Sequence, residues 1–448
     1  MSLRTTELER PRARHRRDDS SLSRRGRQAL AFALLSGAVT HGFNLFQYPL
    51  WQTDEGIYVQ QAWSVIREGK LAPYTYFYDH APGGWLMMAA WARILPGGFQ
   101  TFGAEINTVR VLMLLVHILS VGLMFGLVRR VSGSLVAATV ATFVFNFSPL
   151  AIYYQRMALL DNLMVMWVLL AAYLLIRQER RVLTAVMAGF AGGLAVITKE
   201  NAVFFAPALA YLAYRRARGS RNRRFLTSFW WFTLSVPALG YMLYAQLKSE
   251  LVPAGLSFNL EAPPEGRVSL LYTIWWQLNR TSESGWFMGL LNGSWLFRDR
   301  YVLMVGSAAV LVVLWLWSRD REQRAGYLAV ALLAIGYAFY LVRGSVLLDF
   351  YVAPLVPMLA MNIGLAFAHL TRGLAGRTRV GFTAVVMALT LAVPGGYLLT
   401  HNTEGELVTH DLYHLELTKL QEQQVRFIRE NIPPDARMVI DDDLWIAL

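Results

Sequence analysis

Two adjacent carboxylates, Asp54 and Glu55, follow an apolar stretch and begin the amphipathic segment TDEGIYVQQA. A carboxylate at this position could act as a general base that accepts a proton from an attacking hydroxyl. The alternative is helix capping, with Thr53 or Asp54 as the cap and Glu55 in the first turn, where the helix dipole favours negative charge. Taken alone, the pair is compatible with either role.

Further ionisable and polar side chains lie beside other apolar stretches. They are Asp79 and His80 in YFYDHAP, Arg156 and Asp161 in YYQRMALLDN, Lys199 and Glu200 in ITKEN, and Arg343, Asp349 and Tyr351 in RGSVLLDFYVAP. Charged groups near lipid are costly unless they are paired or used in function. Structural alternatives exist, because Arg156 could pair with Asp161 and the Lys199 side chain could extend to the membrane surface. With the Asp54-Glu55 pair, these make five clusters, which together favour an active site.

These residue types suit the transfer of a sugar from a polyprenyl-phosphate carrier. The leaving group is a phosphate anion, whose oxygens arginine and lysine would stabilise. The attacking hydroxyl needs one carboxylate as base, and a single displacement inverts the anomeric carbon, so no second nucleophilic carboxylate is required. Nucleotide sugars are confined to the cytoplasmic side, whereas a lipid-linked donor fits a site on the outer side of a membrane.

Composition indicates the class of protein that must position these residues. The chain has 448 residues, of which 55% are hydrophobic and only 16% are charged, and this predicts an integral membrane protein. It contains no cysteine, which excludes disulfides and thiolate metal sites. The net charge of +12 would suit a nucleic-acid partner. The basic residues fall in short connections, however, so we expect no nucleic acid and assign them to membrane topology.

A membrane-spanning helix needs about 20 apolar residues. Eleven stretches qualify as candidates, and they lack the alternation typical of a barrel. They are 29–50, 105–128, 134–152, 160–176, 182–198, 202–214, 225–247, 301–317, 325–342, 350–370 and 380–399. The predicted fold class is therefore an all-α polytopic membrane protein with about eleven transmembrane helices.

Charge predicts the orientation of these helices. Alternate connections are basic, and together with the tail of residues 1–28 they hold 26 of the 42 lysines and arginines. By the positive-inside rule these connections are cytoplasmic, whereas 23 of the 30 acids fall on the opposite face. We therefore expect a multi-pass protein of the inner or plasma membrane, with a cytoplasmic N-terminus. Its C-terminus and active site would be extracytoplasmic.

Three parts are expected around this membrane domain of residues 29–399. The first connecting loop, 51–104, should contain two interfacial helices, over 54–67 and 83–95. The second connecting loop, 248–300, is rich in tryptophan, which suits an aromatic belt or a sugar or lipid groove. The C-terminal segment, 400–448, is predicted as a small α/β piece with a helix ended by Pro433 and a strand in ARMVIDDD. It either continues beyond Leu448 or docks on the membrane domain.

The order of these motifs resembles the GT-C fold membrane glycosyltransferases, in the branch of protein O-mannosyltransferases and lipid A aminoarabinose transferases. The matching signals are the Asp54-Glu55 pair, YDHAP, RMALLDN, TKEN and DFYVAPLVP, spread over residues 29–370. The chain departs from the aminoarabinose branch at one motif, because His80-Ala81-Pro82 stands where that branch has Lys-Pro-Pro.

The candidate residues take the following expected roles from this resemblance, and Arg156 and Lys199 are in addition predicted to bind the donor phosphate or the substrate. Asp54 would be the catalytic base, and Glu55 would help to place a substrate. His80 would contact the donor phosphate, Arg343 and Tyr351 would be later phosphate contacts, and Asp161 would lie at the mouth of the cavity. Asp79 matches a position that binds a metal in some members, so a divalent metal ion stays an alternative, although one Asp and one His do not define a zinc site.

The predicted function is inverting transfer of a monosaccharide from a polyprenyl-phosphate-linked donor to a protein, lipid or glycan acceptor in the cell envelope. One alternative is a transporter or lipid flippase, which would place ionisable groups in the middle of its spans. Another is a non-catalytic assembly protein, whose outer carboxylates would tolerate substitution. The residues do not identify the sugar or the acceptor.

Overall fold

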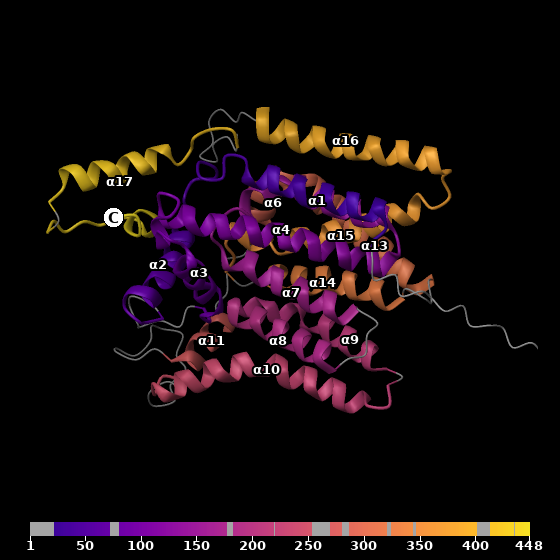
Figure 1. The fold of residues 1–448 in the computed structure, drawn as a ribbon, viewed down its shortest axis with the longest axis horizontal. Helices are drawn as coiled ribbons and strands as arrows, with labels where there is room; N and C mark the ends of the chain where they lie inside the picture. The colour runs from indigo at the N-terminus through magenta and orange to yellow at the C-terminus, as the bar shows by residue number, and fades with distance from the viewer. Residues whose placement is uncertain are drawn as a thin grey trace, which may run out of the picture.

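The computed structural model describes residues 22–71, 80–176, 182–218, 220–252, 269–279, 286–319, 324–343, 346–400, 413–433 and 435–448. Within these ranges every regular element is a helix and no strand occurs (Figure 1). Long helices run roughly parallel to one another and form a bundle, while short helices gather at one end of it. The bundle agrees with the predicted all-α membrane domain.

A helix lies at each of the eleven predicted stretches. These helices are α1 (Arg24–Gly42), α4 (Glu105–Ser132), α5 (Leu135–Phe147), α7 (Leu160–Ile176), α8 (Val182–Thr198), α9 (Ala206–Ala217), α10 (Arg223–Leu247), α13 (Leu296–Arg319), α14 (Arg324–Val342), α15 (Leu355–Leu370) and α16 (Gly376–Thr400). Within the described ranges, five helical stretches are long and apolar enough to cross a membrane, and α5, α7 and α8 are shorter apolar helices. The number of eleven crossings therefore stays a prediction.

The first helix ends earlier than predicted. The apolar run continues to Leu50, but α1 stops at Gly42. Asn44 then takes a left-handed backbone conformation with φ of 53°, which breaks the helical path. Its side-chain amide donates to the carbonyl oxygens of Tyr413 and Leu415, at 3.0 and 2.8 Å. Residues 43–50 thus form a turn that contacts the C-terminal segment.

Close packing of small residues fixes the helix that leads to the ITKEN motif. A side chain at Gly189 or Gly193 of α8 would overlap the backbone of α10 at Trp230 or Leu234. Small residues four apart let two helix backbones approach closely, which is a common contact between membrane helices. Because α8 is held in this way, its end places Lys199 at a defined position.

Short helices from distant parts of the chain gather at the left end of the bundle in Figure 1. The first connecting loop forms α2 (Thr53–Arg67), α3 (Gly83–Ile94) and η1 (Gly98–Gln100), so a helix forms at both stretches predicted to be helical. The second connecting loop contributes α11 (Leu270–Asn279), α12 (Trp286–Leu290) and the π-helix η4 (Leu291–Trp295). Three further short elements are α6 (Pro149–Tyr154), η2 (Glu200–Phe205) and η5 (Asp349–Val352).

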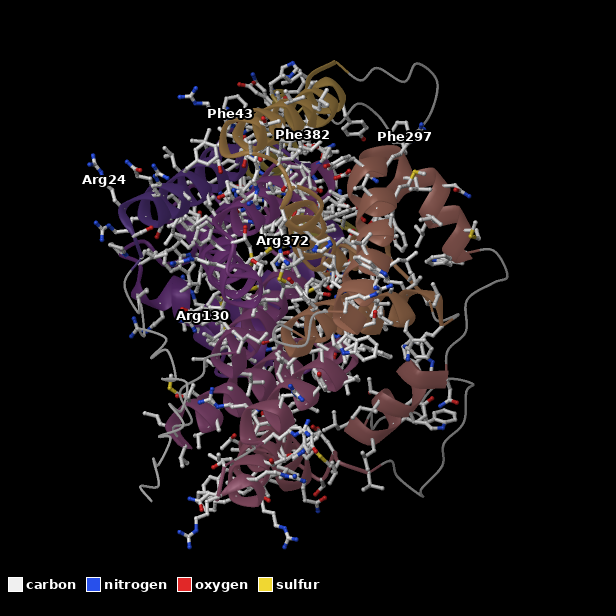
Figure 2. All side chains as sticks on the ribbon, turned by 90° about the vertical axis from the view of Figure 1, so that its right-hand side faces the viewer. Arg24, Phe43, Arg130, Phe297, Arg372 and Phe382 are labelled. Atoms are coloured by element: carbon white, nitrogen blue, oxygen red, sulfur yellow. The ribbon has the colours of Figure 1, made fainter. Side chains whose placement is uncertain are left out.

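The predicted basic connections lie at the opposite end of the bundle. Arg24 begins α1, Arg130 is in the last turn of α4, and Arg372 follows α15. Figure 2 looks onto this end and labels all three side chains. The chain therefore separates the basic turns from the loops that carry the Asp54-Glu55 pair, although the connection at 177–181 and most of the N-terminal tail lie outside the described residues.

The C-terminal segment docks on the first connecting loop. It contains α17 (Lys419–Asn431), which lies at the left in Figure 1, and the short α18 (Asp442–Trp445), which packs against α2. The strand predicted in ARMVIDDD is absent from the described residues, and Val439 within it is fully exposed. A strand forms only where a neighbouring strand supplies hydrogen bonds, and none lies beside this stretch in the described part.

Candidate functional site

Asp54 lies in the first turn of α2, near a second titratable group from the same loop. The Tyr58 hydroxyl, one turn further along α2, donates to Asp54 Oδ1 over 3.5 Å. The buried Tyr58 ring lies 5.9 Å from the imidazole ring of His80, measured between centroids. Asp54 is half-buried, so the carboxylate keeps some solvent access.

His80 is held by Glu200, which lies 120 residues further along the chain. His80 Nδ1 is 2.9 Å from Glu200 Oε2, and the backbone N–H of Ala81 donates to Glu200 Oε1. The His80 side chain is 11% exposed and that of Glu200 is 44% exposed. The fold thus joins the YDHAP and TKEN motifs. We call Asp54, Tyr58, His80 and Glu200 the Asp54 group.

The charge state of Glu200 follows from these contacts. Burial by itself would raise the pKa of Glu200, but the neighbouring His80 and the Ala81 N–H lower it below its ordinary value of 4.5. Glu200 therefore stays ionised at neutral pH and faces His80 Nδ1 as a carboxylate. An imidazolium has a second N–H donor, which neutral imidazole with Nδ1–H lacks.

Lys199, the neighbour of Glu200, belongs to a second group. Lys199 Nζ donates to Asp161 Oδ2 over 2.5 Å, and both side chains are buried. The same ammonium lies 4.4 Å from the ring centroid of Tyr351 and 4.9 Å from that of Phe350. We call Asp161, Lys199, Phe350 and Tyr351 the Lys199 group. It is joined to the Asp54 group along the chain, because Lys199 and Glu200 are consecutive and their Cα atoms lie about 3.8 Å apart.

Arg343 lies beside this second group. Its guanidinium is 5.1 Å from the ring centroid of Tyr340 and 5.4 Å from that of Phe204. The Tyr340 ring in turn lies 6.1 Å from Tyr351. Three residues predicted as phosphate or substrate contacts, Lys199, Arg343 and Tyr351, are therefore linked through aromatic rings.

Glu55 occupies a different environment from Asp54. Arg110 of α4 donates from Nε and Nη2 to the two Glu55 oxygens, at 2.9 and 2.6 Å, and both side chains are completely buried. The backbone N–H groups of Gln52 and Ala158 also donate to Glu55. Arg110 in addition donates to the carbonyl oxygen of Pro49, at 2.8 Å. Glu55 therefore joins α2, α4 and the turn before α7, and it has no exposed surface to offer a substrate.

Arg156 forms no ion pair with Asp161, because Asp161 pairs with Lys199. The buried Arg156 guanidinium donates from Nε to the His41 carbonyl oxygen, at 3.0 Å, and from Nη2 to that of Phe43. These contacts hold the turn after α1. Arg156 thus lies apart from the two groups described above.

The described residues provide no set of ligands for the divalent metal ion that was considered near Asp79 and His80. Asp79 lies outside them, so its position relative to His80 is not described. Within the described ranges, no group of three His, Cys, Asp or Glu side chains is arranged to hold a metal ion.

Some residues near the site carried no obvious signal in the sequence. The only sequence signal for Tyr58 is its position four residues after Asp54, which places both side chains on the same face of a helix. Arg298, at the start of α13, lies 4.7 Å from the Tyr153 ring centroid. The Tyr154 hydroxyl donates to Asp349 Oδ2 at 3.0 Å, and Asp349 belongs to the same short helix as Tyr351. The charged RDR run at 298–300 is the sequence signal that could have pointed to Arg298 and its aromatic neighbours.

Comparison with known proteins gives related structures for this arrangement. Residues 79–244 match the family model described as dolichyl-phosphate-mannose-protein mannosyltransferase. No curated protein sequence matches the chain. Among solved structures, ArnT from Cupriavidus metallidurans bound to undecaprenyl phosphate is similar, with a TM-score of 0.58 and 15% sequence identity. That alignment covers 94% of this chain and 74% of ArnT.

A second similar structure is an archaeal oligosaccharyltransferase. AglB from Archaeoglobus fulgidus, in complex with an inhibitory peptide and a dolichol-phosphate, has a TM-score of 0.57 and 14% identity. The alignment covers 91% of this chain but only 58% of AglB, so the chain spans less than two thirds of that protein. The fold of this chain is that of the GT-C membrane glycosyltransferases, which confirms the resemblance carried by its motifs.

Proposed function

We propose that this chain transfers a monosaccharide from a polyprenyl-phosphate-linked donor to an acceptor hydroxyl or phosphate at the outer face of the membrane. The observation that carries the proposal is the convergence of the Asp54 group and the Lys199 group at the end of the bundle opposite the basic turns. The undecaprenyl phosphate in the ArnT structure and the dolichol-phosphate in the AglB structure support a polyprenyl-phosphate ligand.

Asp54 acts as the general base in this proposal. The carboxylate accepts the proton of the acceptor hydroxyl as the acceptor oxygen attacks the anomeric carbon. The bond from that carbon to the phosphate oxygen breaks, and its electron pair leaves with the polyprenyl phosphate. Attack opposite the leaving group inverts the anomeric centre.

The cations stabilise the departing phosphate. His80, held by Glu200 at Nδ1, has a second ring nitrogen, which donates to a phosphate oxygen when that nitrogen carries a proton. Lys199, paired with Asp161, and Arg343 supply N–H donors near the departing phosphate, where preorganised donors stabilise developing charge. Tyr351 keeps the Lys199 ammonium in place through its ring.

Glu55 takes a positioning role in place of the predicted substrate contact. Its pair with Arg110 ties the start of α2 to α4, and so fixes where Asp54 lies. Arg156 fixes the neighbouring turn through the carbonyl oxygens of His41 and Phe43.

The test is the Asp54→Asn variant. Loss of a general base lowers a rate by about 100-fold to 10,000-fold, so we expect transfer of radiolabelled sugar from the lipid-linked donor to fall by at least about 100-fold. Binding of the donor lipid should be unchanged, because the asparagine amide keeps an oxygen that can accept from the Tyr58 hydroxyl. Asp435→Asn, an equivalent change at an exposed position, is the control. Turnover that survives in Asp54→Asn would rule out the base assignment.

A further inference from the structure

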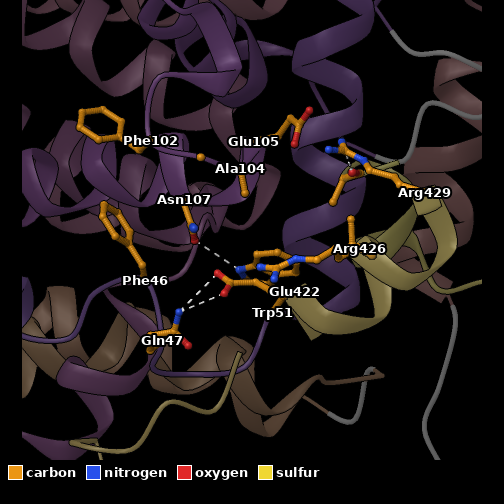
Figure 3. Close-up of a pocket in the computed structure, with 13 residues that line it drawn as sticks. Phe46, Gln47, Trp51, Phe102, Ala104, Glu105, Asn107, Glu422, Arg426 and Arg429 are labelled. Atoms are coloured by element: carbon orange, nitrogen blue, oxygen red, sulfur yellow. Dashed lines mark hydrogen bonds between the residues drawn. The ribbon is translucent and has the colours of Figure 1, made fainter. Parts of the chain in front are cut away.

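A cavity of about 390 Å³ lies between the C-terminal helix α17 and the first connecting loop (Figure 3). Trp51 and Phe46 line it from the turn before α2, Phe102 from the turn before α4, Glu105 from the start of α4, and Arg426 from α17. The volume falls within the range of small-molecule sites, which is about 300–1,000 Å³. None of the roles proposed above uses this cavity.

The cavity walls are fixed to one another by hydrogen bonds. Gln421 of α17 accepts from the backbone N–H of Trp51 at 2.9 Å and donates to the carbonyl oxygen of the same residue at 3.1 Å. The Thr418 hydroxyl donates to the carbonyl oxygen of Phe46 at 2.7 Å. Gln47 donates to both carboxylate oxygens of Glu422, each at 3.3 Å (Figure 3). The C-terminal segment is therefore built onto the turn that leads into α2.

Charges of both signs line the cavity. Two carboxylates, Glu105 and Glu422, face two guanidinium groups, Arg426 and Arg429, so their formal charges cancel. Arg429 donates one N–H to the Ala447 carbonyl oxygen at 2.6 Å. Arg426 makes no hydrogen bond or ion pair with any described residue and keeps its donors available. The lining has no net formal charge but offers both donors and acceptors, and the hydroxyl groups of a neutral polyhydroxyl ligand can bond to both kinds of group.

Aromatic rings complete this chemistry. Phe46 and Phe102 are half-buried, with ring centroids 6.1 Å apart. The buried indole of Trp51 donates to Asn107 Oδ1 at 3.3 Å (Figure 3). Apolar rings beside a few convergent polar groups are typical of small-molecule pockets. Since a sugar ring presents C–H faces as well as hydroxyls, it matches both kinds of surface.

The cavity also lies close to the proposed base. Trp51 precedes Asp54 by three residues, so their Cα atoms are at most about 11 Å apart. Gln60 of α2 donates to the Asp442 carbonyl oxygen at 3.0 Å, which ties the helix of Asp54 to the C-terminal segment again. A ligand in the cavity would therefore have a defined distance from Asp54.

We infer that this cavity binds a neutral saccharide, and that this saccharide is the acceptor of the transferred sugar. The assignment of this saccharide as the acceptor rests on the proposed function, whereas saccharide binding by the cavity does not. Glu422 and Glu105 accept hydrogen bonds from sugar hydroxyls, and Arg426 donates to hydroxyl oxygens. The acceptor class that follows is a glycan, in preference to a peptide side chain or a phosphate group.

The test uses the full chain in detergent and ligand-observed NMR, with no donor present. The probes are neutral trisaccharides of glucose, mannose and galactose, a hexapeptide with serine and threonine, and inorganic phosphate. We expect at least one trisaccharide to bind, with a Kd that rises about tenfold or more in Arg426→Ala and in Glu422→Ala, because each variant loses a charged hydrogen-bonding partner. Arg437→Ala, an exposed change outside the cavity lining, should leave the Kd unchanged.

Three results would overturn the inference: no trisaccharide binds, binding is equal in both cavity variants and the native chain, or only the peptide or phosphate binds. Glu422→Ala removes the hydrogen bonds from Gln47 and could disturb the fold. Arg426 has no described bond to lose, so the Arg426→Ala variant keeps the test decisive. Saccharide binding that depends on Arg426 in a chain without transferase activity would keep the site and refute the proposed function. If the chain transfers sugar but both cavity variants bind saccharides as the native chain does, the proposed function stands and the cavity is not the saccharide site.

Discussion

At the scale of single residues, the adjacent carboxylates Asp54 and Glu55 differ because of where helix geometry directs them. Successive helical residues point about 100° apart, so one can face the protein interior while the next reaches the edge of the site. Glu55 is completely buried against Arg110, whereas Asp54 is half-buried and near Tyr58. The pair thus combines a structural carboxylate with a candidate base.

This difference predicts opposite effects of two similar substitutions. Glu55→Gln leaves the buried Arg110 guanidinium without its counter-charge, and breaking a buried ion pair costs about 3–5 kcal/mol. We therefore expect a clearly lower thermal unfolding midpoint for Glu55→Gln, and no such change for Asp54→Asn. The measurement is thermal unfolding in detergent, with Asp54→Asn as the matched control.

The double variant Glu55→Gln with Arg110→Gln isolates the pair. If the two groups act as a unit, the double variant should lose less stability than the sum of the single variants. A fully stable Glu55→Gln variant without transferase activity would contradict the positioning role and return Glu55 to the catalytic group.

At the scale of elements, the contact between α2 and the C-terminal segment decides how the candidate base is supported. Gly56 of α2 faces the backbone of Asp442 and Asp443, and a Cβ atom there would overlap the Asp442 carbonyl group. Backbone atoms cannot turn away as a side chain can. A larger residue at position 56 must therefore displace the segment that carries α18.

The Gly56→Ala variant tests this contact. Alanine ordinarily stabilises a helix relative to glycine by about 1 kcal/mol, but overpacking costs about 1–3 kcal/mol. We expect faster hydrogen exchange in α17 and weaker saccharide binding in the cavity, since the wall that α17 forms would move. Gly240→Ala in α10, where a Cβ would meet no other atom within 4 Å in the described structure, should leave both unchanged. Native exchange in Gly56→Ala would show that the segment docks independently of α2.

At the scale of the whole molecule, the separation of charge predicts the orientation of the chain in the membrane. The connection between α9 and α10 is basic, whereas α17 lies at the other end of the bundle, beside the candidate site. The sequence contains no cysteine, so a single introduced thiol reports one position without background.

We expect Asn222→Cys to react with a membrane-impermeant maleimide only after the cells are opened, and Gln423→Cys to react in intact spheroplasts. Both positions are exposed in the structure, so burial would not explain a difference. The reverse pattern would place the Asp54 group on the cytoplasmic side and exclude a donor presented at the outer face.

Much of the architecture follows from local patterns. Apolar stretches of sufficient length predict the positions of helices, since a membrane accepts backbone groups only when they are bonded within the segment. The early end of α1 could not be predicted in this way, because it depends on Asn44 and on bonds from Arg156, which lies more than 100 residues away. The absent strand at 436–441 has a similar cause, because pairing with another strand is a tertiary property.

The sequence by itself determined which chemistry is available and in what order along the chain: apolar helices, basic turns, and carboxylates and cations near the helix ends. Only the tertiary structure decided the pairing of these groups. It joined His80 to Glu200, gave Asp161 to Lys199 in place of Arg156, and buried Glu55 against Arg110. The physical reason is that an ion pair needs its atoms within about 4 Å, and spacing along a chain does not fix that distance between separate helices.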